Sequence, residues 1–271
     1  MPITDVSEKS IQQLVSLEGR SAVVTGAGAG IGRAAARRLA EAGAKVMVAD
    51  INAEAAGQTV ADLPGDGHLA QAIDVTDAAS VSAVADAAVQ SLGGIDIWAN
   101  VAGIYPVTPT LDLTDDEWQR ILNINLNGTF YGAREAARRM VAAGGPGVII
   151  NTVSTTVHKV PAPGLAHYIS AKGGVEAMTR ALALEFGGND IRAIAIGPTL
   201  TRTEGTLAQK PHLEAAMGNI GDAHELYGGR LPLGRIATAD DIARVLLFAA
   251  SDLSLMVTGC AIYVDGGDLV F

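Results

Sequence analysis

Short apolar runs alternate along this chain with longer, alanine-rich amphipathic stretches. Each run is nearly continuous in Val, Ile, Leu and Ala, which is typical of strands that are covered on both faces. The predicted strands are Ser21–Thr25, Lys45–Ala49, Leu69–Ile73, Ile95–Ala99, Gly147–Thr152, Ile191–Ile196 and Ala261–Val264. The predicted helices are Ile31–Ala42, Ala53–Leu63, Ala78–Leu92, Asp115–Ala142, Tyr168–Phe186 and Ala239–Ala250. The alternation predicts an α/β fold with a doubly wound parallel sheet of about seven strands and helices on both faces, in three α/β/α layers.

Residues at the expected helix ends agree with these boundaries. Thr76 or Asp77 is suited to begin the helix at Ala78, and Thr114 and Glu117 have the spacing of a capping box. Gly43 follows the first helix, where a glycine commonly ends a helix.

Two segments interrupt the alternation. Residues 1–18 precede the first strand and are expected to form a short helical or loosely attached extension. Residues 201–232 lie between the sixth strand and the last helix and contain several glycines and prolines. A long irregular insertion in a compact fold is more often a lid or binding loop than a disordered segment, so we expect a substrate lid here. Because no linker divides the rest, residues 19–271 are expected to form one domain.

A glycine-rich loop joins the first strand to the first helix. It reads Thr25-Gly26-Ala27-Gly28-Ala29-Gly30-Ile31-Gly32. Missing Cβ atoms allow a tight turn and let a pyrophosphate reach the N–H groups at the helix N-terminus. The alternative is a turn that only packs the helix on the strand. The acidic end of the next strand favours the dinucleotide site.

Polar residues follow the next three strands. Asp50 ends the second strand, where a carboxylate can accept hydrogen bonds from the adenosine ribose and repel a 2′-phosphate, which favours NAD over NADP. Asp74 is suited either to hold the adenine amino group or to act as an N-cap or turn carboxylate for the next helix. Asn100 and Gly103 can let the chain pass beneath a cofactor or can form an ordinary turn. Arg33, inside the first helix, is expected to be solvated.

Tyr168 and Lys172 lie one turn apart at the start of a long helix. Residues i and i+4 share a helix face, so the phenol and the ammonium can converge on one point. A nearby cation stabilises a phenolate, which lets a phenol act as a base closer to neutral pH. The pattern is common, and its value here comes from its position after the fifth strand.

Two further polar side chains complete this group. Ser154, with Thr155 and Thr156 as alternative hydroxyls, follows the fifth strand and is suited to hydrogen-bond a substrate oxygen or to satisfy the backbone. Asn125 is predicted in mid-helix, where an amide is unfavourable by propensity. It is suited to bind a water that links Lys172 to solvent; the alternatives are a kink in the helix or an amide on the helix surface.

Taken together, these motifs resemble the short-chain dehydrogenases/reductases, in the single-domain branch of that family. The residues that carry the resemblance are Thr25-Gly26-x-x-x-Gly30-x-Gly32, Asn100-x-Ala102-Gly103, Asn125, Ser154, Tyr168-x-x-x-Lys172 and Val264-Asp265-Gly266-Gly267. The resemblance extends from Leu17 to the C-terminus. It implies a Rossmann-type fold and an NAD-dependent oxidoreductase that transfers a hydride between nicotinamide and a secondary alcohol or ketone.

The resemblance also implies roles for individual residues. The catalytic residues are then Asn125, Ser154, Tyr168 and Lys172, with Tyr168 as the acid/base. The residues implied to bind the cofactor are Gly26, Gly30, Ile31, Gly32, Asp50, Asp74, Val75, Asn100, Ala102, Gly103, Tyr168, Lys172, Pro198, Thr201 and Thr203.

Three departures from the family pattern affect the fine geometry of this site. Val101 replaces the second asparagine of Asn-Asn-Ala-Gly, and Thr199 replaces the glycine after Pro198. The interval from Ser154 to Tyr168 is one residue longer than usual. None of the three removes a group that transfers a proton.

Composition excludes several classes of protein. Lys and Arg total 19 against 29 Asp and Glu, a formal charge of −10, so no nucleic-acid partner is expected. The single cysteine, Cys260, excludes an internal disulfide and is expected to be an inert core thiol, and no metal site is predicted. No apolar run reaches the ~20 residues of a membrane span, and residues 1–19 lack a signal-peptide core, so a cytoplasmic protein without a membrane partner is expected.

Three segments, residues 104–110, 155–167 and 201–232, are expected to contact the substrate. Their larger side chains are Tyr105, Val107, Val157, His158, Val160, Leu165, Leu207, Met217 and Tyr227. This mainly apolar set favours an alkyl, alicyclic or aromatic alcohol. His158 and His167 are expected to be solvated loop histidines more than substrate ligands. By resemblance, the helices around residues 118–140 and 175–186 form the interfaces of a homotetramer, and the alternative is ordinary packing on the sheet.

Other functions stay open at this stage. A 3-oxoacyl-thioester (acyl-carrier-protein) reductase of the same family commonly uses NADPH, which conflicts with Asp50. A catalytically silent dinucleotide-binding regulator has no need for the four catalytic residues. A methyltransferase with another nucleotide cofactor leaves the Tyr168–Lys172 pair without a purpose.

Overall fold

The computed structural model describes residues 5–209 and 222–270. Its main sheet has seven parallel strands in the order β3-β2-β1-β4-β5-β6-β9, which confirms the predicted doubly wound α/β fold. The strand order reverses beside β1, where β4 pairs on its other side. The strand bounds are β1 Ser21–Thr25, β2 Lys45–Asp50, β3 Leu69–Ala72, β4 Ile97–Asn100, β5 Gly147–Thr152, β6 Ile191–Pro198 and β9 Ala261–Val264.

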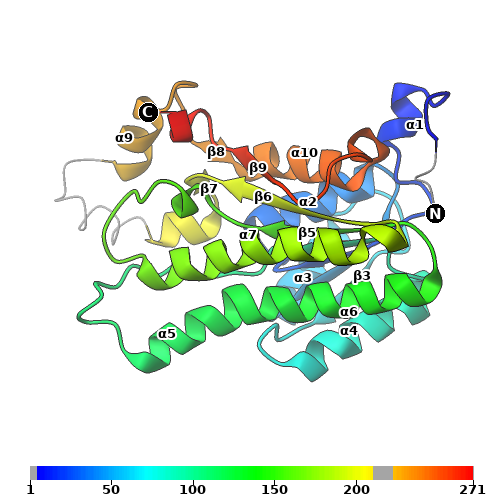
Figure 1. Ribbon diagram of the computed structural model, residues 1–271, viewed down its shortest axis with the longest axis horizontal. Helices are drawn as coiled ribbons and strands as arrows, with labels where there is room; N and C mark the ends of the chain where they lie inside the picture. The colour runs from blue at the N-terminus through cyan, green and yellow to red at the C-terminus, as the bar shows by residue number, and fades with distance from the viewer. Residues whose placement is uncertain (1–4, 210–221, 271) are drawn as a thin grey trace.

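Helices cover both faces of this sheet (Figure 1). One layer contains α2 Gly30–Glu41, α3 Ala53–Ala61 and α10 Ala239–Ala250, and the other contains α4 Ala78–Leu92, α6 Gly128–Ala143 and α7 Ala166–Phe186. Alternate strand residues enter the two cores: Val46 and Val48 face the first layer, and Met47 faces the second. Burying such a side chain stabilises the fold by about 1.5–3 kcal/mol. This two-sided burial explains why the strand segments read as unbroken apolar runs.

The helix predicted over Asp115–Ala142 is not continuous. It divides into α5 Asp115–Leu122, a π-helical turn η1 Asn123–Asn127, and α6. The wider turn is marked by the Gly128 N–H, which donates to the Asn123 carbonyl five residues back. The Asn125 amide nitrogen donates to the Ile121 carbonyl at 3.1 Å and so satisfies an acceptor in the helix itself. The helix is therefore distorted at Asn125, as the expected kink predicts. Such π-helical turns are frequent at functional sites.

Several boundaries differ slightly from the predicted ones. Strand β3 ends at Ala72, and β4 begins at Ile97 because the preceding residue turns its carboxylate onto the Ser21 N–H at 2.7 Å. Asp77 is the N-cap of α4. Thr114 caps α5, but the expected reciprocal bond from Glu117 does not form, since that carboxylate accepts from the Thr108 hydroxyl at 2.8 Å.

The N-terminal extension contains a short helix, α1 Ile11–Val15, at the opposite end of the molecule from α9 Ala223–Arg230 (Figure 1). A capping box of Ser10 and Gln13 begins this helix. The Lys9 ammonium pairs with the Asp252 carboxylate at 2.7 Å, and these contacts attach the described part of the extension to the domain.

The remaining short elements lie in connections. They are η2 Thr155–Val157, η3 Gly187–Asn189, η4 Asp252–Ser254, η5 Asp268–Val270, and the parallel pair of β7 Thr201–Arg202 and β8 Ala237–Thr238. Within residues 5–209 and 222–270, no helix is long and apolar enough to cross a membrane.

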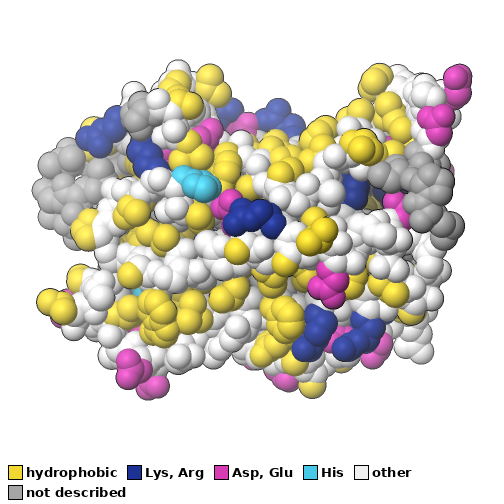
Figure 2. Space-filling view, viewed as in Figure 1, with side chains coloured by type: hydrophobic (Ala, Val, Ile, Leu, Met, Phe, Trp, Pro, Cys, Tyr) yellow, Lys and Arg dark blue, Asp and Glu magenta, His cyan; other side chains and the backbone are white. Residues whose placement is uncertain are grey.

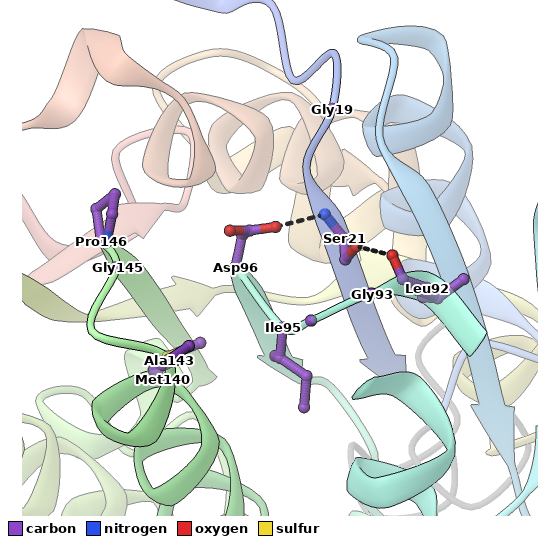
Figure 3. Close-up of a pocket in the computed structure, with 11 residues that line it drawn as sticks. Gly19, Ser21, Leu92, Gly93, Ile95, Asp96, Met140, Ala143, Gly145 and Pro146 are labelled. Carbon is purple, nitrogen blue, oxygen red and sulfur yellow. Dashed lines mark hydrogen bonds between the residues drawn. The ribbon is translucent and has the colours of Figure 1, made fainter. Parts of the chain in front are cut away.

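A surface hollow of about 260 Å³ lies at the amino ends of β1 and β4 (Figure 3). Its polar groups already have partners: the Asp96 carboxylate accepts from the Ser21 N–H, and the Ser21 hydroxyl donates to the Leu92 carbonyl at 3.0 Å. Ligands of open α/β sheets bind at the carboxyl ends of the strands. The hydrogen bonds that line this hollow therefore stabilise the starts of the strands, and the hollow is not the candidate site.

Candidate active site

The predicted site residues gather at the carboxyl edge of the sheet, beginning with the glycine loop after β1. Gly26 and Gly30 have φ values of +67° and +53°, which favour glycine. A Cβ on Gly26 would lie 2.6 Å from the Ala102 Cα, and one on Gly32 would lie 2.1 Å from the Gly26 carbonyl oxygen. The loop therefore needs glycine for close packing as well as for a left-handed turn.

The N-terminus of α2 already attracts an anionic group. The Gly30 N–H donates to the Glu204 carboxylate at 3.1 Å, and the Arg33 guanidinium pairs with the same carboxylate at 3.1 Å. Arg33 is solvated as expected, with 44% of its side chain exposed, and its guanidinium also donates to the Gly28 carbonyl at 3.2 Å. Partial positive charge at a helix N-terminus stabilises a carboxylate or a phosphate alike. The site can thus bind a pyrophosphate at the position that Glu204 now contacts.

The Asp50 carboxylate is held beside this loop at the end of β2. Its two oxygens accept from the Gly28 N–H at 2.8 Å and from the Asn52 N–H at 2.9 Å. These bonds place a negative charge next to the glycine loop. A ribose with free hydroxyls fits such a carboxylate better than one that carries a phosphate.

Asp74, Val75 and Asn100 mainly support the backbone of the edge. The Asp74 carboxylate accepts from the Thr76 N–H and hydroxyl at 2.9 and 2.7 Å, so the turn alternative is observed for this residue. Val75 packs against Gly128, where a Cβ would lie 3.0 Å away. Asn100 is buried and bonds the Asn151 side chain at 2.9 Å.

Tyr168, Lys172 and Ser154 converge where β5 ends and α7 begins. The Ser154 hydroxyl interacts with the Tyr168 phenol and, against the larger effect of burial, lowers the pKa of that phenol. The Lys172 ammonium lies 5.7 Å from the centre of the Tyr168 ring and donates to the Thr152 carbonyl at 2.7 Å. The Ser154 oxygen also accepts from the Thr156 N–H at 3.2 Å, which fixes its position. Ser154, among the three candidate hydroxyls, is the one that contacts the phenol.

Burial shifts both titratable groups of this pair toward their neutral forms. It raises the pKa of Tyr168 to about 12, while the hydrogen bond from Ser154 lowers that pKa and the nearby Tyr105 raises it. Burial also lowers the pKa of Lys172 to about 8. At neutral pH the phenol therefore holds its proton beside a lysine that can still be charged. The site is suited to exchange a proton with a bound oxygen.

Asn125 lies directly behind these residues and is fully buried. Its side-chain oxygen accepts from the Ile104 N–H at 3.2 Å, and its nitrogen donates to the Ile104 carbonyl at 2.9 Å. A Cβ on Gly103 would lie 2.7 Å from the Asn125 oxygen and 3.7 Å from the Lys172 nitrogen. Asn125 therefore ties the segment after β4 to the lysine side of the site.

The segment after β6 covers the glycine loop. Thr203 lies over the N-terminus of α2, with its Cβ 3.3 Å from where a Gly30 Cβ would be. The Thr201 hydroxyl donates to the Thr199 carbonyl at 2.8 Å, which stabilises the turn after Pro198. Against the larger effect of burial, the Thr203 side chain lowers the pKa of Tyr105, and the Tyr105 ring meets that of Tyr168 edge-on at 6.4 Å between centres. Tyr105, in the segment 104–110, therefore lies next to Tyr168.

Two predictions about single side chains were wrong. His167 is fully buried, and its Nδ1 accepts from the Tyr168 N–H at 2.7 Å, so it supports the first turn of α7. Cys260 is exposed, because it precedes β9 at the uncovered edge of the sheet. His158 is half exposed and bonds the Tyr263 hydroxyl at 2.6 Å. Met217, expected in the lid, lies outside the described residues.

Two side chains at the site were missed by the sequence reasoning. Glu204 contacts the α2 N-terminus, and Asp268 contacts Thr155, Thr199 and Tyr227. Neither belongs to a recognisable motif. The substitution of Thr199 for glycine was the one signal that pointed to the second of them.

Comparison with known proteins places this chain among oxidoreductases. A family model described as enoyl-(acyl carrier protein) reductase matches residues 26–268. The chain is 39% identical to "D-threitol dehydrogenase" of Mycolicibacterium smegmatis over 98% of both proteins. It is 38% identical to "3beta-hydroxysteroid dehydrogenase 1" of Eggerthella lenta, over 93% of this chain and 94% of that one. A short-chain type dehydrogenase/reductase from Mycobacterium marinum superposes with a TM-score of 0.85 at 35% identity, covering 95% and 98% of the two chains.

Proposed function

The chain belongs to the short-chain dehydrogenase/reductase family of oxidoreductases that act on alcohols, and from that premise we propose that it is an NAD-dependent dehydrogenase of secondary alcohols. The observation that carries the proposal is the convergence of Ser154, Tyr168 and Lys172 beside the glycine loop and Asp50. A phenol and a serine hydroxyl in contact can bind one alcohol oxygen together. A base and a hydrogen-bond donor at that oxygen are what alcohol oxidation requires.

The residues at the carboxyl edge fit a dinucleotide. The N–H groups of Gly30 and Ile31 at the start of α2 would bind the pyrophosphate, and Asp50 would bind the adenosine ribose. Because Gly26 has no side chain, the glycine loop can pack closely against Ala102 at this edge of the sheet. Pro198, Thr201 and Thr203 would border the nicotinamide. When bound, the dinucleotide supplies the acceptor for the hydride of the alcohol.

Proton transfer is the part of the reaction that this chain performs itself. The Ser154 hydroxyl would orient the alcohol oxygen toward the Tyr168 phenol, which would take up the alcohol proton as a phenolate. Lys172, whose ammonium lies 5.7 Å from the centre of the Tyr168 ring, would stabilise that phenolate with its positive charge. In the reducing direction the protonated phenol donates its proton to the carbonyl oxygen. The arrangement places acid, hydrogen-bond donor and cation on one side of the substrate.

The substrate is proposed to be a secondary alcohol of mainly apolar character. The two named relatives act, by their names, on a small polyol and on a steroid, so the family membership leaves the size of the alcohol open. Apolar side chains in the surrounding segments, such as Val107 beside Gly164, favour an alkyl or ring-bearing alcohol. The alternative is a 3-oxoacyl-thioester reductase, which shares with the description of the matching family model, enoyl-(acyl carrier protein) reductase, only the carrier-bound thioester.

One screen tests this function. Purified protein is incubated with NAD⁺ or NADP⁺ and a panel of secondary alcohols that includes a butanediol, a tetritol, a cyclohexanol and a hydroxysteroid, and the reduced cofactor is followed by absorbance. We expect turnover with NAD⁺ and a preference for the apolar members. A panel of 3-oxoacyl thioesters with NADPH is run in parallel. Turnover only in that second panel would replace the proposed function with the thioester reductase.

Removing the Glu204 carboxylate is expected to strengthen NAD binding. This side chain is 61% exposed and contacts the Gly30 N–H and Arg33, the groups proposed to bind the pyrophosphate. A charge at a helix terminus contributes about 0.3–1 kcal/mol, so Glu204→Gln should lower the Kd for NAD by about two- to fivefold. Isothermal titration calorimetry without alcohol measures this. Glu41→Gln removes the same charge near the other end of α2 and should leave the Kd for NAD unchanged. A Kd for NAD that is higher in Glu204→Gln than in wild type would contradict the prediction.

The proposal extends to the organisation of the molecule. Hydrophobic side chains gather over α5, α6 and α7 on the face shown in Figure 2, and Phe130 and Leu184 are 41% and 89% exposed. Such exposed apolar groups support a homotetramer in which α6 and α7 form interfaces. Residues 19–271 are proposed to act as one domain, with a substrate lid at about residues 201–232, of which 210–221 lie outside the described residues.

A further inference from the structure

A buried carboxylate, Asp268, lies where three segments around the candidate active site meet. The residue is 2% exposed and begins η5, four residues after β9 ends. Gly266 and Gly267 have φ values of 61° and 92°, so the chain reverses there and returns toward the interior. The Asp265 carboxylate accepts from the Gly267 and Leu269 N–H groups at 3.0 Å each. The backbone of this turn therefore fixes the position of the Asp268 side chain.

Three hydroxyl groups donate to a single oxygen of this carboxylate. The distances to Oδ2 are 2.7 Å from Thr199, 2.6 Å from Tyr227 and 3.4 Å from Thr155. The Lys159 ammonium lies 3.1 Å from the other oxygen. Burial alone would raise the pKa of Asp268, but the bonds from Tyr227, Thr199 and Lys159 hold it below its usual range. The group is therefore an ionised acceptor that keeps all of its donors in place.

Each donor belongs to a different part of the site. Thr155 directly follows Ser154 and begins the short helical turn η2. Thr199 directly follows β6, and Tyr227 belongs to α9 in the proposed lid. The Tyr227 hydroxyl also lies 3.3 Å from the Thr199 hydroxyl. One carboxylate thus joins the serine turn, the exit of β6 and the lid helix.

The substitution of threonine at position 199 gains a physical reason here. The glycine that the family pattern has after Pro198 offers no side-chain donor, whereas Thr199 supplies a hydroxyl 2.7 Å from Asp268. A buried carboxylate that loses donors is costly, so the threonine and the aspartate stabilise each other. The threonine that departs from the pattern and the buried aspartate are therefore donor and acceptor of one hydrogen bond.

We propose that Asp268 is a positioning residue that holds the lid helix α9, through Tyr227, against the turn that carries Ser154. It thereby sets how closely α9 approaches the alcohol that Ser154 and Tyr168 bind. The inference rests on the proposed dehydrogenase function for its kinetic consequences. Its structural part, the coupling of α9 to the serine turn, stands on the hydrogen bonds alone.

The test combines kinetics with amide hydrogen exchange in the full-length protein. Tyr227→Phe removes the hydrogen bonds of α9 to Asp268 and to Thr199, and it should raise the KM for the alcohol by about tenfold, with kcat within about twofold of wild type. Asp268→Asn also weakens the Thr155 and Thr199 bonds, so kcat should fall as well. Neither change should alter the KM for NAD. In both variants, exchange in residues 223–230 should be faster than in wild type.

A double variant and a control separate coupling from simple damage. Tyr227→Phe combined with Asp268→Asn should accelerate exchange in 223–230 by less than the sum of the two single changes, since both act on the bond between Tyr227 and Asp268. Tyr131→Phe removes a phenolic hydroxyl from α6, outside the site, and should behave as wild type. Thr199→Gly gives the same test by a milder change if Asp268→Asn does not fold, with faster exchange in 223–230 expected.

The outcomes distinguish this inference from the proposed function. Wild-type exchange rates in residues 223–230 of both Tyr227→Phe and Thr199→Gly would overturn the inference. So would a rise of the KM for NAD equal to that for the alcohol. If wild type oxidises no alcohol with NAD⁺, the proposed function fails, and the exchange rates still decide whether Asp268 holds α9.

Discussion

Replacing Tyr168 with phenylalanine is expected to lower kcat for alcohol oxidation by about 10²–10⁴-fold, the usual contribution of a general acid or base. The change removes the one phenolic oxygen that contacts the Ser154 hydroxyl. The ring itself stays packed edge-on against Tyr105. Affinity for NAD should therefore remain within about twofold of wild type. Steady-state kinetics and calorimetric titration with NAD measure the two quantities.

The control for this experiment is again Tyr131→Phe, which removes a phenolic hydroxyl away from the site and should retain full turnover. Lys172→Met should also lower kcat, because the phenolate then loses the cation 5.7 Å from the ring centre. If Tyr168→Phe keeps more than about a tenth of wild-type kcat, the phenol is not the acid/base and the proposed chemistry is wrong.

The second large effect is expected at the ribose end of the cofactor site. Asp50→Ala combined with Ile51→Arg should shift the ratio of kcat/KM for NAD over that for NADP by about 100-fold toward NADP. The carboxylate beside Gly28 repels a 2′-phosphate, and an arginine next to it would attract one. Ile51 is 78% exposed, so the arginine can be accommodated without disturbing the core. Initial rates with each cofactor at several concentrations give the ratio.

Ile51→Arg alone is the matched control, since it adds the cation and keeps the Asp50 carboxylate. It should move the ratio much less than the double variant does, because the repulsion remains. An unchanged ratio in the double variant, with both cofactors still bound, would show that Asp50 does not contact the ribose.

The local features of the fold were predictable from the sequence because they depend on neighbouring residues. Strands buried on both faces need continuous apolar runs, and a left-handed turn such as that at Gly26 needs glycine. The four-residue spacing of Tyr168 and Lys172 places both on one face of α7 wherever that helix lies. These signals were sufficient to predict the parallel sheet and the order of the motifs along the chain.

The conformation of the helix around Asn125 could not be predicted from neighbouring residues alone. Propensity marked the asparagine as unfavourable in a helix but could not distinguish a kink from a surface position. The deciding contacts are with the backbone of Ile104, on a segment that follows another strand. Likewise, the burial of His167 and the exposure of Cys260 follow from which elements lie beside them and not from their own neighbours in the sequence.

The sequence by itself determined the order of strands and helices along the chain, the glycine loop, and the spacing of Tyr168 and Lys172, the pair proposed to act in proton transfer, since each is encoded within a few consecutive residues. Only the tertiary structure decided that Glu204 meets the start of α2 from 174 residues away, and that Asp268 joins Thr199 across 69 residues. The physical reason is that the contacts of a buried or helix-capping carboxylate depend on which groups donate hydrogen bonds to it. Those donors come together only when distant segments pack against the same edge of the sheet.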